Sequence, residues 1–208
     1  MFSIGLGHKR EKIIAVADIG SGSAGVAILS ARQGVPARII AAERLTLPFE
    51  ERSVEQTIAG IVSQLSLAGE KALAAYRAEA REGALPVSSV SAIIRAPWTR
   101  SETIRGTSRF SDERRIDGET ISALAKSALN QDATFDRANI FEASIVRVEL
   151  NGYPTGKPAG KQAKSIRVAS LVSDCDPRIR DGVTESLSRM FLCSRPSRRS
   201  GTRALLRV

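Results

Sequence analysis

A mixed α/β fold is the architecture that the sequence predicts, and three observations support it. Residues 13–43 hold three apolar runs separated by short turns that contain glycine, as in a three-stranded antiparallel meander. Residues 53–81 carry apolar side chains at helical spacing. Residues 87–176 then follow the order strand, helix, strand and strand, which is typical of a compact α+β module. With 208 residues, the chain is long enough to bury a core.

The meander and the helix after it have clear start and stop signals. The meander is expected to contain a strand pair around a turn at 20–23, a second turn at 31–34 and a third strand at 37–43. Ser53 at the N-cap, with Gln56 three residues later, forms a capping-box pattern that predicts the start of the helix. The helix is expected to run to about Arg81, and Gly83 marks its end.

The module at 87–176 is divided by turns and prolines. Its expected elements are a strand at 90–94, an extended segment at 100–110, a helix at 118–130, a long alternating strand at 140–150 and a return strand at 165–173. Asp117 is placed to cap the helix. Asn151 and Gly152 begin the turn after the long strand. Trp98 is expected either as a core residue or as an exposed contact residue, and both alternatives stay open.

The C-terminal segment differs in composition from the rest of the chain. A helix is expected from Pro177 to about Met190, and an Arg/Ser-rich run follows it. From Pro177 onward, eight arginines stand against Asp181 and Glu185, so most of the net charge of +9 lies here. The Arg/Ser-rich run buries too little apolar surface to offset its ordering entropy, so a disordered tail is expected. The expected divisions of the chain are 10–86, 87–176 and 177–208.

The turn at 20–23 is the candidate ligand-binding element. Asp18 lies at the end of the first strand, where a carboxylate can hold a hydrated Mg²⁺ beside phosphates. Gly20 and Gly22 permit positive φ angles and a close approach of the backbone to a ligand. Successive amide groups of such a turn can bind an anion, and Ser21 and Ser23 add hydroxyl donors. Hairpins rich in Gly and Ser are also common in proteins that bind nothing there, so a purely structural turn is the alternative.

Composition argues against several functional classes. Apolar residues make up 42% of the chain and charged residues 25%, as in ordinary globular proteins. No apolar run approaches the roughly 20 residues that span a bilayer, and the first residues lack the order of a secretory signal, so a cytoplasmic location is expected. Cys175 and Cys193 have no zinc or disulfide spacing. His8 is the only histidine, so no Ser-His-Asp or Cys-His arrangement is expected.

The remaining reactive side chains are interpreted as structural, and no catalytic residue is assigned. Cys175 has no basic activator nearby in the sequence and is expected to be a partly buried small residue. Asp112, Glu113 and Asp117 form an acidic cluster that is interpreted as a solvated loop and a helix cap. Nucleic-acid binding is not expected, because the basic charge is confined to the tail and the aromatic residues are scattered.

The order of these parts resembles the N-terminal half of FtsA- and PilM-type bacterial actin-like proteins. The sequence Asp18-Ile19-Gly20-Ser21-Gly22-Ser23, followed by Val26-Ala27-Ile28, is similar to the first phosphate motif of that family. The strand–helix–strand–strand module resembles the insertion domain, subdomain IC, of the cell division protein FtsA. Within it, Leu150-Asn151-Gly152-Tyr153-Pro154-Thr155, with Pro158 and Lys161, resembles the Asn-Gly-Tyr turn of the family. The likeness covers about residues 10–190.

This resemblance implies a partial actin-like (ribonuclease H-like) ATPase lobe that carries the insertion domain. It implies a role in cell division and septum assembly at the inner face of the bacterial membrane, with PilM-like pilus assembly as the alternative. Intact members clasp ATP and Mg²⁺. By position, Asp18 would serve the metal and phosphate end, and the phosphates would lie against Gly20, Ser21, Gly22 and Ser23. Implied partners are other division or pilus-assembly proteins, or further copies of the chain through the insertion domain.

Several parts of the family pattern have no counterpart in this sequence. These are the second phosphate hairpin, the glycine pair that contacts adenosine, the second lobe and the C-terminal membrane-targeting helix. Half a clasp cannot enclose a nucleotide, so neither tight ATP binding nor hydrolysis by this chain alone is expected. The abrupt change to Arg/Ser-rich sequence near Met190 suggests a truncated or frameshifted product.

Three functions follow from these observations. The first is a nonenzymatic division or pilus scaffold that acts through its insertion domain. The second is an ATP-binding actin-like protein of which this chain is a fragment. The third is a binder of nucleic acid or anionic lipid through the basic tail.

Overall fold

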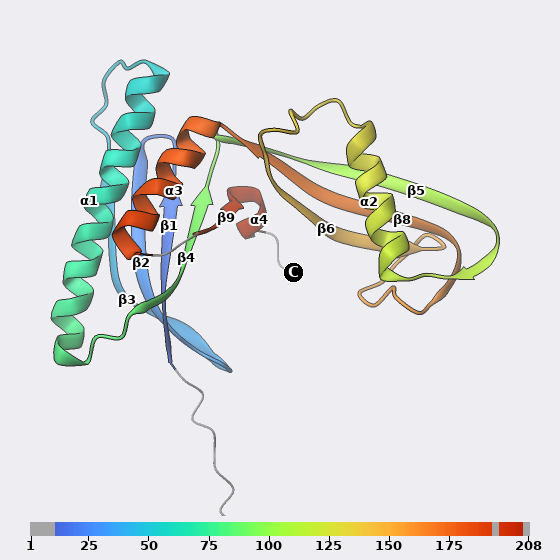
Figure 1. Ribbon diagram of the computed structural model, residues 1–208, viewed down its shortest axis with the longest axis horizontal. Coiled ribbons are helices and arrows are strands. Elements are labelled where there is room, and N and C mark those ends of the chain that lie inside the picture. The colour runs from blue at the N-terminus through green and yellow to red at the C-terminus, as the bar shows by residue number, and fades with distance from the viewer. Residues whose placement is uncertain (1–10, 193–195, 206–208) are drawn as a thin grey trace, which may run out of the picture. The chain divides into compact units, whose positions relative to one another are not determined.

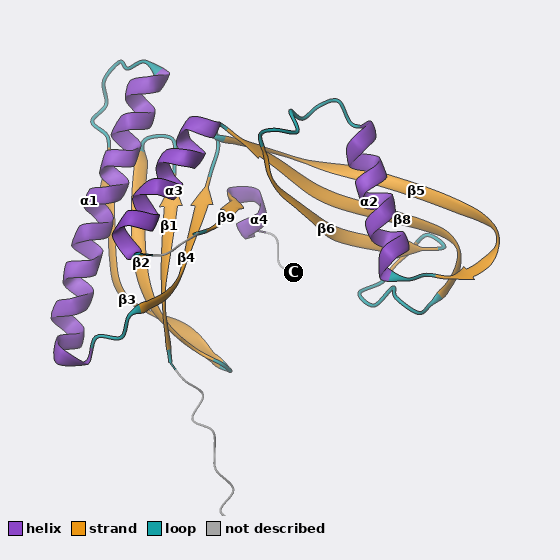
Figure 2. Cartoon of the chain, in the orientation of Figure 1, coloured by secondary structure: helices purple, strands orange, loops and turns teal. Residues whose placement is uncertain are grey.

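Two units make up the part of the chain that the computed structural model describes, residues 11–192 and 196–205 (Figure 1). The chain passes from the first unit to the second after Trp98, returns at Pro177 and leaves again after Arg199. The second unit is therefore inserted into the first. Each unit combines helices with its own sheet (Figure 2), which confirms the predicted α/β class.

The first unit is built on a five-stranded sheet. Its strands are β1 (Lys12–Ile19), β2 (Ser23–Arg32), β3 (Val35–Thr46), β4 (Val87–Ile94) and β9 (Ser197–Ser200), in the order β3-β2-β1-β4-β9. β2 is antiparallel to both β1 and β3, so the predicted meander is confirmed. β4 runs parallel to β1 on its other side. Parallel neighbours need a long crossover, which the helix between β3 and β4 supplies.

That helix, α1 (Val54–Ala80), begins at the predicted capping box. The Ser53 hydroxyl accepts a hydrogen bond from the Gln56 amide, and the Gln56 side chain accepts one from the Ser53 amide. A 3₁₀ turn, Arg81–Gly83, follows α1, so the predicted end of the helix is also confirmed. In Figure 1, α1 lies along the same face of the first sheet as α3 (Pro177–Phe191).

The core of the first unit lies between this sheet and the two helices. β1 alternates buried and half-buried residues, as a strand with one covered face does. Leu65 on α1 and Leu187 on α3 are fully buried. The helices pack closely because Gly182 of α3 faces Val62 of α1: a Cβ on that glycine would lie 2.9 Å from Val62 Cγ2.

The second unit is a four-stranded antiparallel sheet with one long helix. Its elements are β5 (Thr99–Arg115), α2 (Gly118–Gln131), β6 (Ile140–Leu150), β7 (Tyr153–Pro154) and β8 (Gln162–Cys175), and the strand order is β5-β8-β6-β7. The strand–helix–strand–strand order is found, with β5, predicted as the extended segment at 100–110, as its first strand. Within residues 11–192 and 196–205, no helix is both long and apolar enough to span a lipid bilayer.

α2 lies close to its sheet because a glycine faces it. A Cβ on Gly106 of β5 would lie 3.0 Å from both Leu124 Cγ and the Leu124 carbonyl oxygen of α2. The Asp117 side chain caps the helix as predicted and accepts a hydrogen bond of 2.7 Å from the Thr120 amide. The helix therefore packs on β5 and β8 and covers one face of the sheet.

The predicted boundary at residue 86 differs from the structure. The strand predicted at 90–94 was assigned to the second module, but it is part of β4 and belongs to the first sheet. Its pairing with β1 joins residues more than 70 positions apart, with Ala17 opposite Ala92. Such a long-range pairing leaves no local sequence signal, because β2, β3 and α1 separate β4 from β1 along the chain.

The predicted disordered tail also differs from the structure where the structure describes it. Residues after Pro196 form β9 and then α4 (Gly201–Leu205). Glu142 on β6 is buried, and its Oε2 accepts hydrogen bonds from the Ser200 amide at 3.0 Å and the Ser200 hydroxyl at 2.9 Å. Arg203 Nε lies 3.8 Å from Glu142 Oε1. Hydrogen bonds and an ion pair thus order a segment that has little apolar surface to bury.

Candidate functional site

The turn between β1 and β2 is the tight hairpin that the sequence predicts. β1 ends at Ile19 and β2 begins at Ser23, and the Gly20 amide donates a hydrogen bond of 2.9 Å to the Ser23 carbonyl. Ser21 and Gly22 at the tip are exposed. Among the described residues their amide groups have no partner, and a Cβ on Gly22 would meet nothing within 4 Å. The tip therefore offers two open N–H donors.

A row of residues across three strands brings two opposite charges together beside this tip. Asp18 of β1 stands opposite Gly25 of β2, and Gly25 stands opposite Arg44 of β3. Arg44 reaches across β2, where its guanidinium forms an ion pair with the Asp18 carboxylate. Its Nη1 also donates a hydrogen bond of 2.9 Å to the Ser23 hydroxyl. Arg44 thus links the hairpin tip to the strand that leads into it.

Gly25 is the residue that lets Arg44 reach Asp18. A Cβ at this position would lie 3.3 Å from Cζ and from Nε of Arg44, and 3.2 Å from the Glu43 carbonyl oxygen. Both are tighter than ordinary van der Waals contacts, so any side chain here would crowd the guanidinium. A depression of about 240 Å³ lies alongside, over Val16 and Ala27.

A second arginine reaches the same carboxylate from the end of β4. Arg95 follows that strand, its amide donates a hydrogen bond of 3.0 Å to the Ile19 carbonyl, and its Nε lies 2.6 Å from Asp18 Oδ1. Both arginines are about half exposed, whereas the Asp18 side chain is 19% exposed. The cluster of Asp18, Arg44 and Arg95 thus carries one positive charge in excess, presented to solvent.

Trp98 contacts the hairpin through a hydrogen bond from its buried side chain. It is 8% exposed, and its indole Nε1 donates a hydrogen bond of 2.7 Å to the Gly20 carbonyl. A buried tryptophan needs such a partner for its N–H. Of the two alternatives for this residue, the core position is correct, and Trp98 fixes the position of the turn.

The arrangement fits an anion better than a cation at Asp18. Both oxygens of this carboxylate pair with arginines, so a metal ion would have to displace at least one guanidinium. No group of three or more His, Cys, Asp or Glu residues gathers in the part of the chain that the structure describes. The open amides of Ser21 and Gly22 and the two guanidinium groups are the donors that a phosphate accepts from. The metal role of Asp18 stays a prediction.

The structure brings together all five residues of the predicted phosphate site. Asp18, Gly20, Ser21, Gly22 and Ser23 lie within one hairpin. The positive φ angles that Gly20 and Gly22 permit are not adopted, because neither glycine of the turn has one. The amide of Gly20 is also occupied by the hairpin's own hydrogen bond, so the anion-binding groups are fewer than the glycine pattern suggests.

Sequence reasoning missed the two arginines. An uninterrupted ladder counted back from the turn, where Arg32 faces Val35, would place Ala42 opposite Gly25. Two irregularities in the β2–β3 ladder shift the register and bring Arg44 there instead. Arg44 is one of three charged residues of β3, with Arg38 and Glu43, so the strand's own sequence does not single it out, and Arg95 gave no signal.

Other candidates for chemistry have structural roles where the structure describes them. Cys175 was predicted to be partly buried, and it is almost completely buried, at 2% exposure. Asp117 is the helix cap, and Asp112 and Glu113 are exposed on β5. His8 and Cys193 lie outside the described residues.

Comparisons with known proteins find likeness in solved structures only; no protein-family model and no curated protein matches. A PilM–PilN type IV pilus biogenesis complex is similar with a TM-score of 0.48 and 11% identity, over 89% of this chain and 45% of that one. The Aquifex aeolicus PPX-GPPA enzyme has a TM-score of 0.28 and 20% identity, over 41% and 27% of the two chains. A glycerol dehydratase reactivase has a TM-score of 0.24 and 21% identity, over 47% and 15%. This chain spans less than half the length of each.

Proposed function

We propose that this chain is an assembly protein of the bacterial actin-like type, similar in role to the cell division protein FtsA. One observation carries the proposal: a separate sheet-and-helix unit is inserted between β4 and α3 of a meander-based unit. Together with the hairpin that holds Asp18 to Ser23, this is the order of parts that the sequence resemblance implies. The function would be exerted in the cytoplasm, at the inner face of the membrane.

The second unit is the proposed contact surface. Ile145, Val146 and Tyr153 are exposed apolar or aromatic side chains on its β6 and β7 strands. Such side chains on a strand near a sheet edge are suited to docking another protein. The expected partners are other division proteins or further copies of the chain. The chain would therefore act through protein contacts and would not hydrolyse ATP by itself.

A gene deletion tests this proposal and separates it from the pilus alternative. We expect deletion to give elongated cells with missing septa, and a plasmid copy of the whole chain to restore normal length. Normal cell length with loss of surface pili would replace the division role with a PilM-like one. Normal length together with normal pili would contradict both. The readouts are cell length by microscopy and pili by electron microscopy.

Binding of nucleotide phosphates at the hairpin is a second candidate function. It is favoured by the excess positive charge of Arg44 and Arg95 next to the open amides of Ser21 and Gly22. The test is calorimetric titration of the whole chain with Mg-ATP, Mg-ADP and inorganic phosphate. Arg44→Gln should weaken binding at least fivefold. Arg38→Gln, on the same strand but paired with Glu79, is the matched control and should leave it unchanged.

The same variants connect the two candidate functions. One outcome is that the Arg44→Gln chain restores cell length in the deletion strain as well as the natural chain does. In that case the assembly role does not depend on phosphate binding at the hairpin. If no phosphate compound binds the natural chain at millimolar concentration, the nucleotide candidate is excluded and the assembly proposal stands.

A further inference from the structure

The outer edge of β6 carries hydrogen-bonding groups that no strand of the described chain uses. β8 lies on one side of β6, and on the other side β7 pairs only with Glu149 and Leu150. Within residues 11–192 and 196–205, the stretch 143–147 therefore has one edge without a neighbouring strand. A free edge of this kind is a template for pairing with an extended segment of another chain.

A bulge on this edge sends neighbouring side chains to opposite faces of the sheet. Ile145 stands opposite Ser170 of β8, and Arg147 stands opposite the adjacent Ala169, so the ladder shifts at Val146. Without the shift, Ile145 and Arg147 would share a face, because side chains alternate along a strand. With it, Ile145 faces α2 and Arg147 faces the uncovered side of the sheet.

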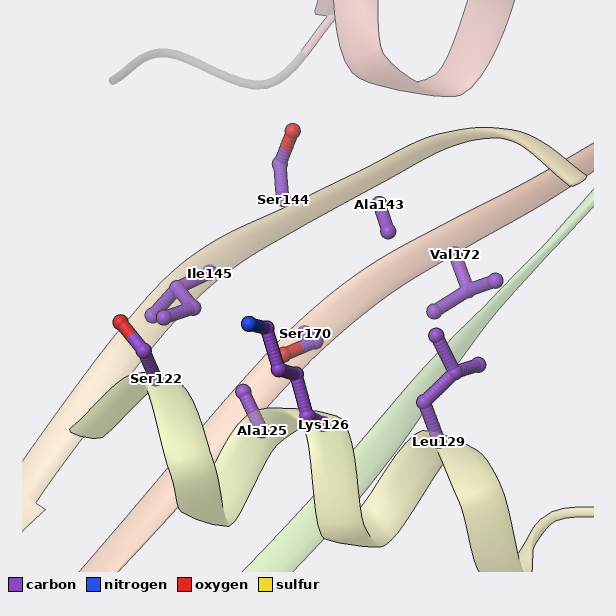
Figure 3. A pocket seen from close by; sticks show the side chains of 9 residues that line it. All are labelled: Ser122, Ala125, Lys126, Leu129, Ala143, Ser144, Ile145, Ser170 and Val172. Carbon is purple, nitrogen blue, oxygen red and sulfur yellow. The ribbon is translucent and has the colours of Figure 1, made fainter. Parts of the chain in front are cut away.

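On the α2 side, the edge is bordered by an apolar groove of about 260 Å³. Figure 3 shows Ala143 and Ile145 of β6 on one wall and Ala125 and Leu129 of α2 on the other, whereas Ser144 points away from the helix. Ile145 is 40% exposed. α2 packs on β5 and β8 and leaves this part of β6 uncovered, so the groove is open toward the free edge.

On the opposite face, the same stretch borders a basic recess of about 340 Å³. Arg105 of β5 and Arg147 of β6 both stand opposite Ala169, so they flank one small residue. Arg147 Nε lies 2.7 Å and Arg167 Nη1 3.3 Å from the single carboxylate of Glu149. Arg105 has no partner among the described residues. Three guanidinium groups thus face one carboxylate, and the recess is positively charged.

We propose that β6 binds an extended segment of a partner protein in which apolar and acidic residues alternate. The backbone of that segment would pair with the edge at 143–147 and extend the sheet. Side chains of an added strand alternate between the two faces. One set would enter the apolar groove beside Ile145, and the other would place carboxylates over Arg147, at the near side of the basic recess. This inference rests on the proposed function, because it names the chemistry of the partner.

Charge complementarity selects this occupant over a second copy of the chain. If two β6 strands paired edge to edge across a two-fold axis normal to the sheet, both basic recesses would lie on the same face. Arg147 of each copy would then face the positive recess of the other, and like charges directly opposite are destabilising. A partner strand with carboxylates on that face removes the repulsion and forms charge-assisted hydrogen bonds.

Fluorescence anisotropy with the whole chain and labelled ten-residue peptides tests the proposal. A peptide of alternating Val and Glu should bind, and one of alternating Val and Gln should bind at least tenfold more weakly. Arg147→Glu should weaken the Val/Glu peptide at least tenfold. Lys157→Glu, an exposed residue of the same unit outside both recesses, makes the same charge change and should have no effect. N-methylation of alternate peptide amides should abolish binding, because it blocks strand pairing but not charge attraction.

Several outcomes would overturn the inference. These are no binding of the Val/Glu peptide by the natural chain, equal binding of the Val/Gln peptide, retained binding after N-methylation, and stronger binding of single-stranded DNA or phosphatidylglycerol vesicles at the same recess. Such a result leaves the assembly proposal intact if gene deletion still changes cell length or piliation. Conversely, peptide binding with no deletion phenotype would retain the binding site and remove the proposed function.

Discussion

The two units cover their sheets to very different degrees. In the first unit, α1 buries seven residues against the sheet and α3 packs beside it. In the second unit, α2 alone lies on the sheet and has one buried residue, Ile121, and β6 is left uncovered along its edge. The first unit is therefore held by a dense core between its sheet and its helices. In the second unit, fewer helix side chains are buried and more of the sheet surface stays accessible. We expect the first to supply most of the stability and the second most of the contacts.

The strongest test of this comparison is truncation of a leucine in each helix. Leu65 of α1 is fully buried, whereas Leu129 of α2 is partly buried. Leu65→Ala should lower the unfolding free energy by about 3 kcal/mol, and Leu129→Ala by only about 1 kcal/mol. Urea unfolding followed by the fluorescence of Trp98 measures the first unit, and hydrogen exchange of α2 amides measures the second. Equal losses at the two sites would contradict the comparison.

A second test fills the space where α2 approaches its sheet. Gly106→Val would place side-chain atoms against Leu124, including its backbone oxygen, which cannot move without the helix. Overpacking of this kind should destabilise the second unit by about 2 kcal/mol and speed hydrogen exchange in α2. Gly156→Val is the control, since a Cβ there meets nothing within 4 Å. Unchanged exchange in α2 after Gly106→Val would mean that the glycine does not set the helix position.

Local sequence signals predicted the parts of both units that depend on local chemistry. The strand at 140–150, the capping box of Ser53 and the cap at Asp117 are found where the pattern placed them. These features involve residues close together in the chain, so periodicity and capping preferences describe them fully. The same holds for the hairpin that carries Gly20 and Gly22.

Features that depend on distant pairing were not predictable. β4 pairs with β1 although the whole of α1 lies between them in the sequence, and nothing in the sequence of β4 indicates which strand it pairs with. Arg44 reaches Asp18 only because the β2–β3 ladder shifts twice and Gly25 leaves room for the guanidinium. The described part of the tail is held by the buried carboxylate of Glu142, which lies 58 residues before Ser200 in the sequence. The sequence therefore predicted Asp18 of the candidate site but not the two arginines, Arg44 and Arg95, that pair with it.

A smaller effect is expected at the start of α1. Ser53→Ala removes the side-chain acceptor of the Gln56 amide and breaks the capping box, which should cost about 1 kcal/mol of unfolding free energy. Because α1 is held by its buried face, the loss should be spread over the first unit and leave exchange in α2 unchanged. Ser63→Ala in the middle of the same helix is the control. A loss much larger than that of Leu65→Ala would show that the cap, and not the core, stabilises α1.

The smallest expected effect is a pH dependence that distinguishes the caps of the two helices. Hydrogen bonds from the Thr120 amide and side chain hold the pKa of the Asp117 carboxyl below its ordinary value. A carboxyl with a lowered folded-state pKa stabilises the fold above its unfolded pKa, near 4, and this contribution is lost as the pH falls through the folded-state pKa. The N-cap of α1 is the Ser53 hydroxyl, which does not titrate in this range.

Acidification below about pH 4 should therefore loosen the first turn of α2. The readout is the Thr120 amide resonance in a two-dimensional NMR titration, which should shift with the protonation of Asp117. The Gln56 amide, at the matching position of α1, reports on the first turn of that helix. This turn contains one acidic residue, Glu55, whose pKa is also lowered by hydrogen bonds. The comparison therefore uses the Glu55→Gln variant, in which the first turn of α1 has no acidic group. Asp117→Asn keeps a capping oxygen but cannot titrate, so it should abolish the Thr120 shift. A shift that persists in this variant would assign the pH dependence to another carboxyl.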